Sequence, residues 1–406
     1  MTGTQAPTLL DLFSARWADD PYGMYRHLRE RTPVFWDEIM RSWVVLGYDD
    51  IARFGKDDRL SGARIVGFSE SLPADIRAEM APLTGVLSDM MLFNEPPRHT
   101  RLRQLVKPGM TPRYVRELRP FITAVADDLL DKVAGSGRID IIHDYSEPLT
   151  RAVISRMTGV PEHAMPLLES WKGLLPEYFS QSRTEIPRVE KLRCVFAEGA
   201  QARRSGTGHD VFSRMIGEQL HRVDADDEEI FANFLLLIDA GQATTTHLIG
   251  NAVLALTQQP DQLRLLRERP ELATGAAQEL MRFDSSVQFT TRVASTDIEV
   301  AGHRIRAGES VTLVLGSGNR DPRHYPDPDR IDITRKASDH LSLGHGIHYC
   351  LGAALALAEI EIALVRLLDR TSSLEPAAAR QDWLESINFR FLKRLPMRFT
   401  PAPAHA

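Results

Sequence analysis

The sequence predicts a mainly helical protein with a small β region, organised as one domain. Long stretches carry apolar residues at the three- and four-residue spacing of a helix face, whereas the alternating pattern of a strand is confined to short pieces. No internal repeat, low-complexity tract or Pro/Gly/Ser-rich linker interrupts the 406 residues. We therefore expect a single domain over residues 1–406.

Each expected element follows from its local pattern, with single turns at Pro322, Pro326 and Pro328 as the strongest breaks. The helical period marks Tyr22–Arg31, Thr100–Val106, Pro120–Val133, Glu228–Leu256, Pro260–Arg267, Leu272–Phe283 and Leu351–Leu368. Strand-like alternation marks Val34–Trp36, Trp43–Leu46, Ile298–Val300 and Ser310–Leu315.

Composition is that of an ordinary globular protein, with 43% hydrophobic and 26% charged residues. The net charge of −6 gives no electrostatic support to a nucleic-acid partner. The N-terminal residues show no secretory pattern, and apolar runs such as Phe234–Ile238 are far shorter than the ~20 residues of a membrane span. Two cysteines and no targeting segment predict a cytoplasmic protein.

The most informative stretch is the run from Leu343 to Gly352, which contains Cys350. The only other cysteine is Cys194, so neither a disulfide framework nor a four-cysteine metal site can form around it. A helical pattern begins directly after the run, and a sulfur at a helix N-terminus is favoured as the thiolate. Gly344 lets the preceding loop fold tightly. A single thiolate held in this way suits axial ligation of haem iron.

The run resembles the haem-binding loop of cytochrome P-450 enzymes, Phe-Gly-x-Gly-x-His-x-Cys-x-Gly, and departs from it only at Leu343. The resemblance extends from Asp20 to Phe399. It implies the P-450 fold with a long central helix crossing the haem, and Cys350 as iron ligand with Gly344 and Gly352 beside it. It also implies a monooxygenase that inserts oxygen from dioxygen into a small organic substrate. No Cys-x-x-Cys-His is present, so dissociable haem b is expected.

The resemblance also suggests which groups hold the haem propionates. His99 and Arg103 share one face of an expected helix, a spacing that is also common on solvated surfaces. They match a propionate-binding His-x-x-x-Arg of bacterial P-450 enzymes, and Arg292 and His348 match two further contacts.

A second group of charged residues is expected to brace the haem loop. Glu279 and Arg282 are three apart on an expected helix, which alone would predict an exposed pair. The family pattern joins them with Arg330 in a buried network, whose role is structural rather than catalytic.

The helix expected over the oxygen side of the haem contains Ala240, Gly241, Ala243 and Thr244. Ala240 and Gly241 leave space for a flat cofactor and dioxygen, and Thr244 can turn its hydroxyl into that space. The family carries an acid where this chain has Ala243, and alanine cannot relay a proton. This departure keeps open radical coupling, a peroxide-driven reaction, a substrate-assisted route, or a haem protein that binds or senses a ligand without oxidising it.

A substrate cavity above the iron should be dry and largely apolar. Arg64 and Gln288 are weak candidates for a polar anchor. The residues expected to line this cavity are Phe68, Met90, Met91, Leu174 to Phe179, Leu236, Ala240, Val287, Phe289 and Phe389.

The sequence has no Gly-x-Gly-x-x-Gly after a strand and no reductase-sized extension, so it predicts no flavin or nicotinamide site. Electrons from NAD(P)H should arrive through separate proteins, most simply a ferredoxin and a ferredoxin reductase. Arg103, Lys107 and Arg113 are candidate charged contacts for such a partner near Cys350.

Overall fold

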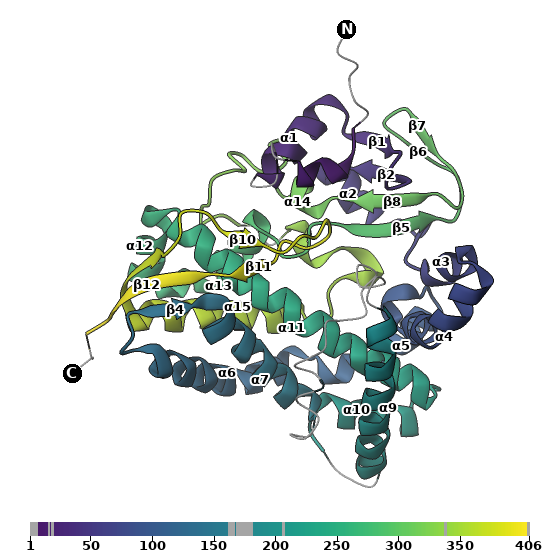
Figure 1. Ribbon diagram of the computed structural model, residues 1–406, viewed down its shortest axis with the longest axis horizontal. Helices are drawn as coiled ribbons and strands as arrows, with labels where there is room; N and C mark the ends of the chain where they lie inside the picture. Colours follow the sequence, from purple (N-terminus) through teal and green to yellow (C-terminus); the bar gives the residue numbers. More distant parts are fainter. Residues whose placement is uncertain are drawn as a thin grey trace. The chain divides into compact units, whose positions relative to one another are not determined.

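The computed structural model describes the chain except residues 1–6, 15–16, 18–19, 161–166, 168–181, 205–207, 337–338 and 404–406, and the side chains of 182–185. The chain forms two compact units, drawn in Figure 1. One comprises Met1–Leu60, Arg119–Leu149 and Thr244–Ala406, and the other comprises Ser61–Leu118 and Thr150–Ala243. The helices α6, α7 and α11 each contribute residues to both units.

Helices make up most of the described structure. The α-helices are α1 (Pro21–Arg31), α2 (Tyr48–Phe54), α3 (Ile65–Ser71), α4 (Ala74–Asp89), α5 (Arg98–Val106), α6 (Pro112–Val133), α7 (Glu147–Thr158), α9 (Ser182–Arg204), α10 (Val211–His221), α11 (Asp227–Thr257), α12 (Pro260–Glu268), α13 (Ala273–Phe283), α14 (Leu315–Gly318) and α15 (Ala353–Arg370). Shorter helical turns are η1 (Leu9–Phe13), η2 (Met91–Phe93), η3 (Lys107–Gly109), η4 (Ile141–Ser146), η7 (Pro270–Leu272), η8 (Leu341–Leu343) and η9 (Gly346–His348).

The strands are short and fall into small sheets. The largest has the order β1-β2-β8-β5-β3, a second has the order β4-β12-β9, and β6-β7 and β10-β11 form two-stranded sheets. Their bounds are β1 (Val34–Asp37), β2 (Ser42–Val45), β3 (Leu60–Ser61), β4 (Arg138–Asp140), β5 (Thr290–Ala294), β6 (Ile298–Val300), β7 (His303–Ile305), β8 (Ser310–Leu313), β9 (Thr371–Pro376), β10 (Asp382–Trp383), β11 (Leu392–Arg394) and β12 (Pro396–Pro401).

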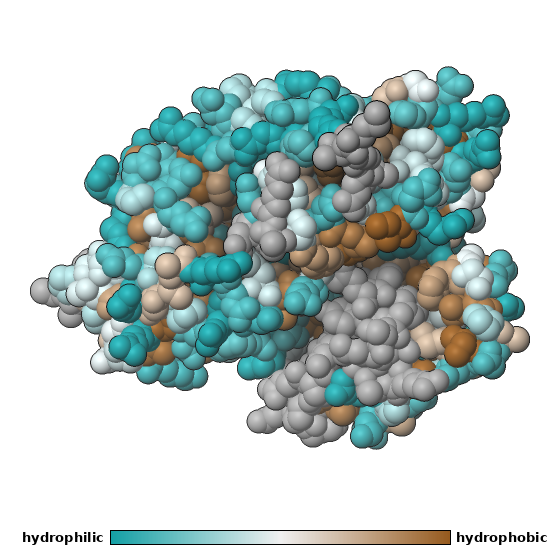
Figure 2. Space-filling model, turned by 45° about the horizontal axis from the view of Figure 1, so that its top comes forward, coloured by the Kyte–Doolittle hydropathy of each residue, from teal (hydrophilic) through white to brown (hydrophobic). Residues whose placement is uncertain are grey.

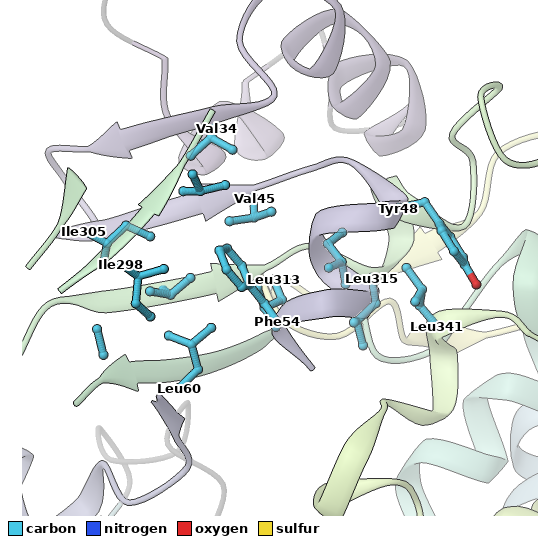
Figure 3. Packing of buried hydrophobic residues seen from close by; sticks show 14 of the residues in the cluster. Val34, Val45, Tyr48, Phe54, Leu60, Ile298, Ile305, Leu313, Leu315 and Leu341 are labelled. Atoms are coloured by element: carbon cyan, nitrogen blue, oxygen red, sulfur yellow. The ribbon is translucent and has the colours of Figure 1, made fainter. Parts of the chain in front are cut away.

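The largest sheet joins distant parts of the chain. β2 pairs in parallel with β8 in the register Ser42↔Ser310, and β8 pairs antiparallel with β5. One face of this sheet packs on a cluster that includes Val34, Val45, Phe54 and Leu313, shown in Figure 3. Burial of such side chains contributes roughly 1.5–3 kcal/mol each, so this cluster fixes the sheet and α2 together.

A second core cluster lies under α1 and includes Tyr25, Phe35, Phe289 and Val314. Figure 1 shows α1 beside β1 and β2. The N-terminal turn η1 is tied to β1 because Asp37 accepts hydrogen bonds from the Thr8 hydroxyl and the Leu9 backbone.

The predicted fold class is confirmed, and most element positions agree within a few residues. The largest difference is α6, which begins at Pro112 and continues through Pro120, although proline lacks the N–H that an interior helical position uses. The strand predicted over Ser310–Leu315 ends at Leu313, because the chain turns there into α14. The helices α2, α3, α4, α7, α9, α10 and α14 were not predicted.

The face of the molecule in Figure 2 is mostly hydrophilic, with small hydrophobic areas, as is usual for folded proteins. In the part of the chain that the structure describes, no helix combines the length and apolar character needed to cross a membrane.

Candidate active site

The loop before α15 holds Cys350 between two short turns and the helix. The Cys350 backbone N–H donates to the carbonyl of Leu343 at 2.8 Å, which closes the loop on itself. Gly352 is the N-cap of α15, so the sulfur lies beside the first free N–H groups of an 18-residue helix. Cys350 is partly exposed. Burial, and then the charge of Cys350, raise the pKa of the neighbouring Tyr349.

Two glycines of this loop adopt a backbone conformation that other residues rarely adopt. Gly344 and Gly346 both have φ of 70°. At Gly346 a Cβ would also lie 2.3 Å from the carbonyl oxygen of Gly55, so the loop needs glycine there to approach the end of α2. The loop is therefore anchored to the largest sheet through α2.

A buried ion pair between Glu279 and Arg282 supports the same loop. Arg282 and Glu279 on α13 pair at 2.7 Å with both side chains 0% exposed. Arg282 also donates to the carbonyl of Asn319 at 2.8 Å. The Asn319 side chain in turn donates to the Ser342 hydroxyl and accepts from the backbone N–H of Leu341. The ion pair thus connects through Asn319 to the turn that begins the cysteine loop.

The prediction that Arg330 completes this network is wrong for its side chain. Arg330 is exposed, and only its carbonyl takes part, accepting from Arg282 at 3.3 Å. The second cation beside Glu279 is Arg335, at 3.3 Å. In the turn from Pro326 to Arg330, it is the backbone carbonyl of Arg330, and not its side chain, that faces Arg282.

The long helix α11 carries one partly exposed face in an otherwise buried segment. Every residue from Ile230 to Leu256 is buried except Ala240, Gly241, Gln242, Ala243, Thr244 and His247. Positions 240, 243, 244 and 247 fall on one face of an α-helix. An exposed face in the middle of a buried helix is what a helix bordering a cavity presents.

Comparisons with known proteins agree with this arrangement. The family described as Cytochrome P-450 matches residues 195–392. A relative named "Biotin biosynthesis cytochrome P-450" from Bacillus subtilis (strain 168) is 36% identical over 395 residues, which cover 95% of this chain and 98% of the relative. A "Vitamin D(3) 25-hydroxylase" from Pseudonocardia autotrophica is 36% identical over 409 residues, covering 99% of each chain. The chain belongs to the cytochrome P-450 family.

A solved structure gives the same result for the fold. The myxobacterial cytochrome P-450 CYP267B1, in complex with myristic acid, superposes with a TM-score of 0.85 at 32% identity, covering 98% of this chain and 100% of that one. The protein is therefore an oxygen-incorporating oxidoreductase, a P-450 monooxygenase of the bacterial type. It binds haem, uses dioxygen, acts on a small organic substrate and receives electrons from redox partners.

The donor set of this P-450 fits haem. Among the described residues no three His, Cys, Asp or Glu side chains gather as a metal cluster. A single cysteine thiolate is one of the ligands by which proteins hold haem iron. Arg292 and His348 lie in the same compact unit as Cys350. Arg292 is buried on β5 and donates to the Thr290 hydroxyl at 2.8 Å. A buried guanidinium of this kind suits a carboxylate partner.

His99 and Arg103 lie on α5 in the other compact unit. Burial, followed by the charge of Arg103, lowers the pKa of His99, so its imidazole is neutral near pH 7. It can then donate one hydrogen bond without bringing a second charge.

Gly241 has a packing role in addition to the one predicted from the sequence. A Cβ at Gly241 would lie 2.5 Å from the Cδ1 atom of Ile154 on α7. Its small size therefore admits the packing of Ile154. Ala240 and Ala243 are exposed and leave the open space on this helix.

The residues predicted to line the substrate cavity divide into several environments. Phe289 belongs to the core cluster under α1, so its side chain is used in packing. Phe389 forms a bridge with Val287 and stacks on Phe391, with ring centroids 4.7 Å apart. Met91 and Leu236 are buried, whereas Phe68 on α3 is 38% exposed. Leu174 to Phe179 lies outside the described residues.

The two suggested polar anchors already have partners in the structure. Gln288 donates to the Tyr22 hydroxyl and to the carbonyl of Ser285. Arg64 lies 4.6 Å from the centre of the Phe93 ring. Neither is kept as a substrate anchor.

His247 is a candidate residue that the sequence analysis missed. It lies one turn beyond Thr244, and the helical spacing from Ala240 could have found it. The search for the oxygen-binding motif ended at the threonines, because the family pattern ends there.

Proposed function

We propose that this P-450 binds haem b through the Cys350 thiolate, with His99, Arg103, Arg292 and His348 holding the propionates. The observation that carries the proposal is the loop itself: a cysteine just before the N-terminus of α15, a positive φ at Gly344 and Gly346, and the buried brace from Glu279 to Ser342. A rigid loop fixes the distance of one sulfur to one metal, whereas a cysteine in a flexible segment would not.

The chain's own groups have distinct tasks in this proposal. The bound haem supplies the activation of dioxygen, and thiolate ligation favours cleavage of its O–O bond. Hydrogen bonds from the loop around Cys350 orient the sulfur and adjust its basicity. Gly352 and the start of α15 favour its negative charge. The cationic and imidazole groups neutralise two carboxylates that would be costly to bury alone.

On the oxygen side we propose that Thr244 would present its hydroxyl to the space that dioxygen uses, with the small residues Ala240, Gly241 and Ala243 leaving that space open. The hydroxyl can both donate and accept, so it can hold a proton-carrying water in place. Met91, Leu236, Val287 and Phe389 are proposed to bound the substrate side with apolar surface that excludes water.

The route of the electrons is also part of the proposal. NAD(P)H would reduce a ferredoxin reductase, which would pass electrons one at a time through a ferredoxin to the P-450. The support is the sequence, in which no Gly-x-Gly-x-x-Gly pattern for a dinucleotide follows a strand. We propose that both compact units act as one P-450 domain in the cytoplasm, where a free metal-binding thiol persists.

The absence of an acid at Ala243 also supports a second reaction type. Radical coupling or a peroxide-driven oxidation would need less proton delivery than dioxygen activation with two electrons. Comparing product yields with hydrogen peroxide alone and with NADH plus a ferredoxin pair separates these routes.

The deciding experiment is the spectrum of the reduced carbon monoxide adduct. Wild type should show the strongly red-shifted Soret band of thiolate-ligated haem, and Cys350→His should lose it. An unchanged band in the variant would reject Cys350 as ligand. Arg103→Ala should lose haem on dialysis more readily than wild type, and equal retention would reject its propionate role.

A further inference from the structure

The partly exposed face of α11 continues one turn past Thr244 and ends at His247. The two residues are three apart in one helix and lie in the same compact unit. Side chains of an α-helix lean towards its N-terminus, so the residue at 247 covers the surface beside Ala243 and Thr244. The imidazole is therefore placed next to the position where the acid is missing.

The ring of His247 is held by stacking rather than by a hydrogen bond. It lies on Phe391 with centroids 4.0 Å apart and an angle of 17° between the planes. Phe391 stacks in turn on Phe389, which bridges to Val287. The Nδ1 atom is buried and has no hydrogen-bond partner within the described part of the chain. Stacking fixes the plane of the His247 ring. Both ring nitrogens lie in that plane, so the stacked Phe391 ring does not cover them.

Burial keeps this imidazole neutral. It lowers the pKa of His247 to about 3. A neutral imidazole has one N–H donor and one acceptor nitrogen. It can therefore accept a proton at one nitrogen and release a proton from the other while the ring stays neutral overall.

A second histidine, His143, lies at the surface of the same compact unit. His143 on η4 has a side chain that is 58% exposed, and its Nδ1 lies 3.2 Å from a carboxylate oxygen of Glu147. The charge of His143 is the second cause, after burial, of the lowered pKa of His247. Geometry places η4 against the same part of α11, because a Cβ at Gly250 would lie 2.5 Å from the Cδ1 atom of Ile142, the residue before His143.

We propose that His143 and His247 form a proton path from solvent to the Thr244 face of α11, replacing the acid that is absent at Ala243. This inference rests on the proposed dioxygen-dependent function. In that reaction one oxygen atom enters the substrate, and the other leaves as water after taking up two electrons from the redox partners and two protons from solvent.

In each transfer along the path, His247 loses one proton and gains one. One ring nitrogen releases its proton towards the Thr244 hydroxyl, while the other takes a proton that comes from the His143 side. The imidazole ends neutral as its other tautomer, and exchange with water restores the first. Hydrogen-bonded water joins the groups where the gap exceeds 3.5 Å.

The test compares His247→Phe with wild type, since phenylalanine keeps the ring stack but cannot carry a proton. The assay uses a ferredoxin pair with NADH and myristic acid as the organic probe. It measures the rate of NADH consumption, its solvent isotope effect, and the fraction of NADH recovered as hydrogen peroxide. These quantities are defined whether or not the probe is oxidised. We expect a rate loss of about tenfold, a larger isotope effect and a severalfold larger peroxide fraction.

Two further variants separate a relay from a packing role. His143→Gln should change the same quantities in the same direction but less, and the exposed His221→Gln on α10 should change none. Adding Ala243→Asp to His247→Phe should restore the rate and lower the peroxide fraction. Wild-type values in His247→Phe, or a defect that Ala243→Asp does not repair, would overturn the relay.

A readout without turnover uses nitrogen-15-labelled histidine in the reduced carbon monoxide complex. His247 should remain neutral down to pH 5, and its ring nitrogen signals should shift in His143→Gln. Unshifted signals would overturn the coupling. If wild type instead shows no thiolate spectrum and no NADH consumption, the proposed function fails and not the relay alone.

Discussion

Replacing Arg282 by methionine tests the brace beneath the cysteine loop. The change removes both bonds to Glu279, at 2.7 and 2.8 Å, and the three bonds to the backbone carbonyls of Asn319, Pro328 and Arg330. Glu279 remains 0% exposed, with Arg335 at 3.3 Å and the backbone N–H of Asp332 at 3.0 Å as its remaining partners. Breaking one side of such a buried pair costs about 3–5 kcal/mol, a large part of a typical folding free energy.

The measurement is guanidinium unfolding of the haem-loaded protein, followed by circular dichroism and by the thiolate Soret band. In Arg282→Met we expect the Soret band to be lost at a lower denaturant concentration than the helical signal, because the loop is released before the helices unfold. In wild type the two transitions should lie closer together. Glu279→Gln provides a milder variant if Arg282→Met does not fold.

A matched control is available on the hairpin of β6 and β7. Arg304 pairs with Asp297 at 2.5 Å, but both side chains are largely exposed. Arg304→Met should leave both midpoints unchanged, since exposed pairs contribute little. If Arg282→Met and Arg304→Met behaved alike, the argument that burial makes the brace essential would be refuted.

Three further outcomes follow from the geometry. Burial lowers the pKa of His340 to about 4, below its unfolded value, so the unfolded state binds more protons between pH 6.5 and 4 and stability falls as the pH drops through that range. Over this range wild type should lose ~3 kcal/mol of its free energy of unfolding, and His340→Asn should lose less. Denaturant unfolding midpoints at each pH measure this loss, and an equal dependence on pH in the two proteins would contradict the prediction. Gly346→Ala should reduce haem retention more than Gly302→Ala does. Both glycines have positive φ, but only at Gly346 would the added Cβ lie 2.3 Å from a backbone atom. Equal haem retention in the two variants would argue against the steric cause. Ala243→Asp in the wild-type background should lower the peroxide fraction only if proton supply is limiting, and an unchanged fraction would show that the existing path is sufficient.

The cysteine loop was predictable because its information is local. Glycine conformation, the position before a helix and the single sulfur all lie within ten residues, so no knowledge of tertiary contacts was needed. The helices α1, α11 and α15 were predicted for a similar reason, since their apolar spacing is long and regular.

The errors arose where side-chain direction depends on tertiary packing. Arg330 and Arg335 are both basic and close in sequence, and only the folded turn decides which one reaches Glu279. Phe289 could face either side of the chain leading into β5, and packing under α1 decided the outcome. His247 differs from these cases, because helical geometry alone relates it to Thr244.

The parallel pairing of β2 with β8 has a consequence for synthesis of the chain. Ser42 and Ser310 are partners, yet about 270 residues lie between them. At a translation rate of 5–20 residues per second, β2 waits roughly 15 to 55 s on the ribosome before its partner emerges. During that time one edge of the β1–β2 hairpin has unpaired backbone groups, which makes it a site for aggregation or for chaperone binding. The cysteine loop is made later still, so haem held by Cys350, as proposed, would not be available as a template for early folding.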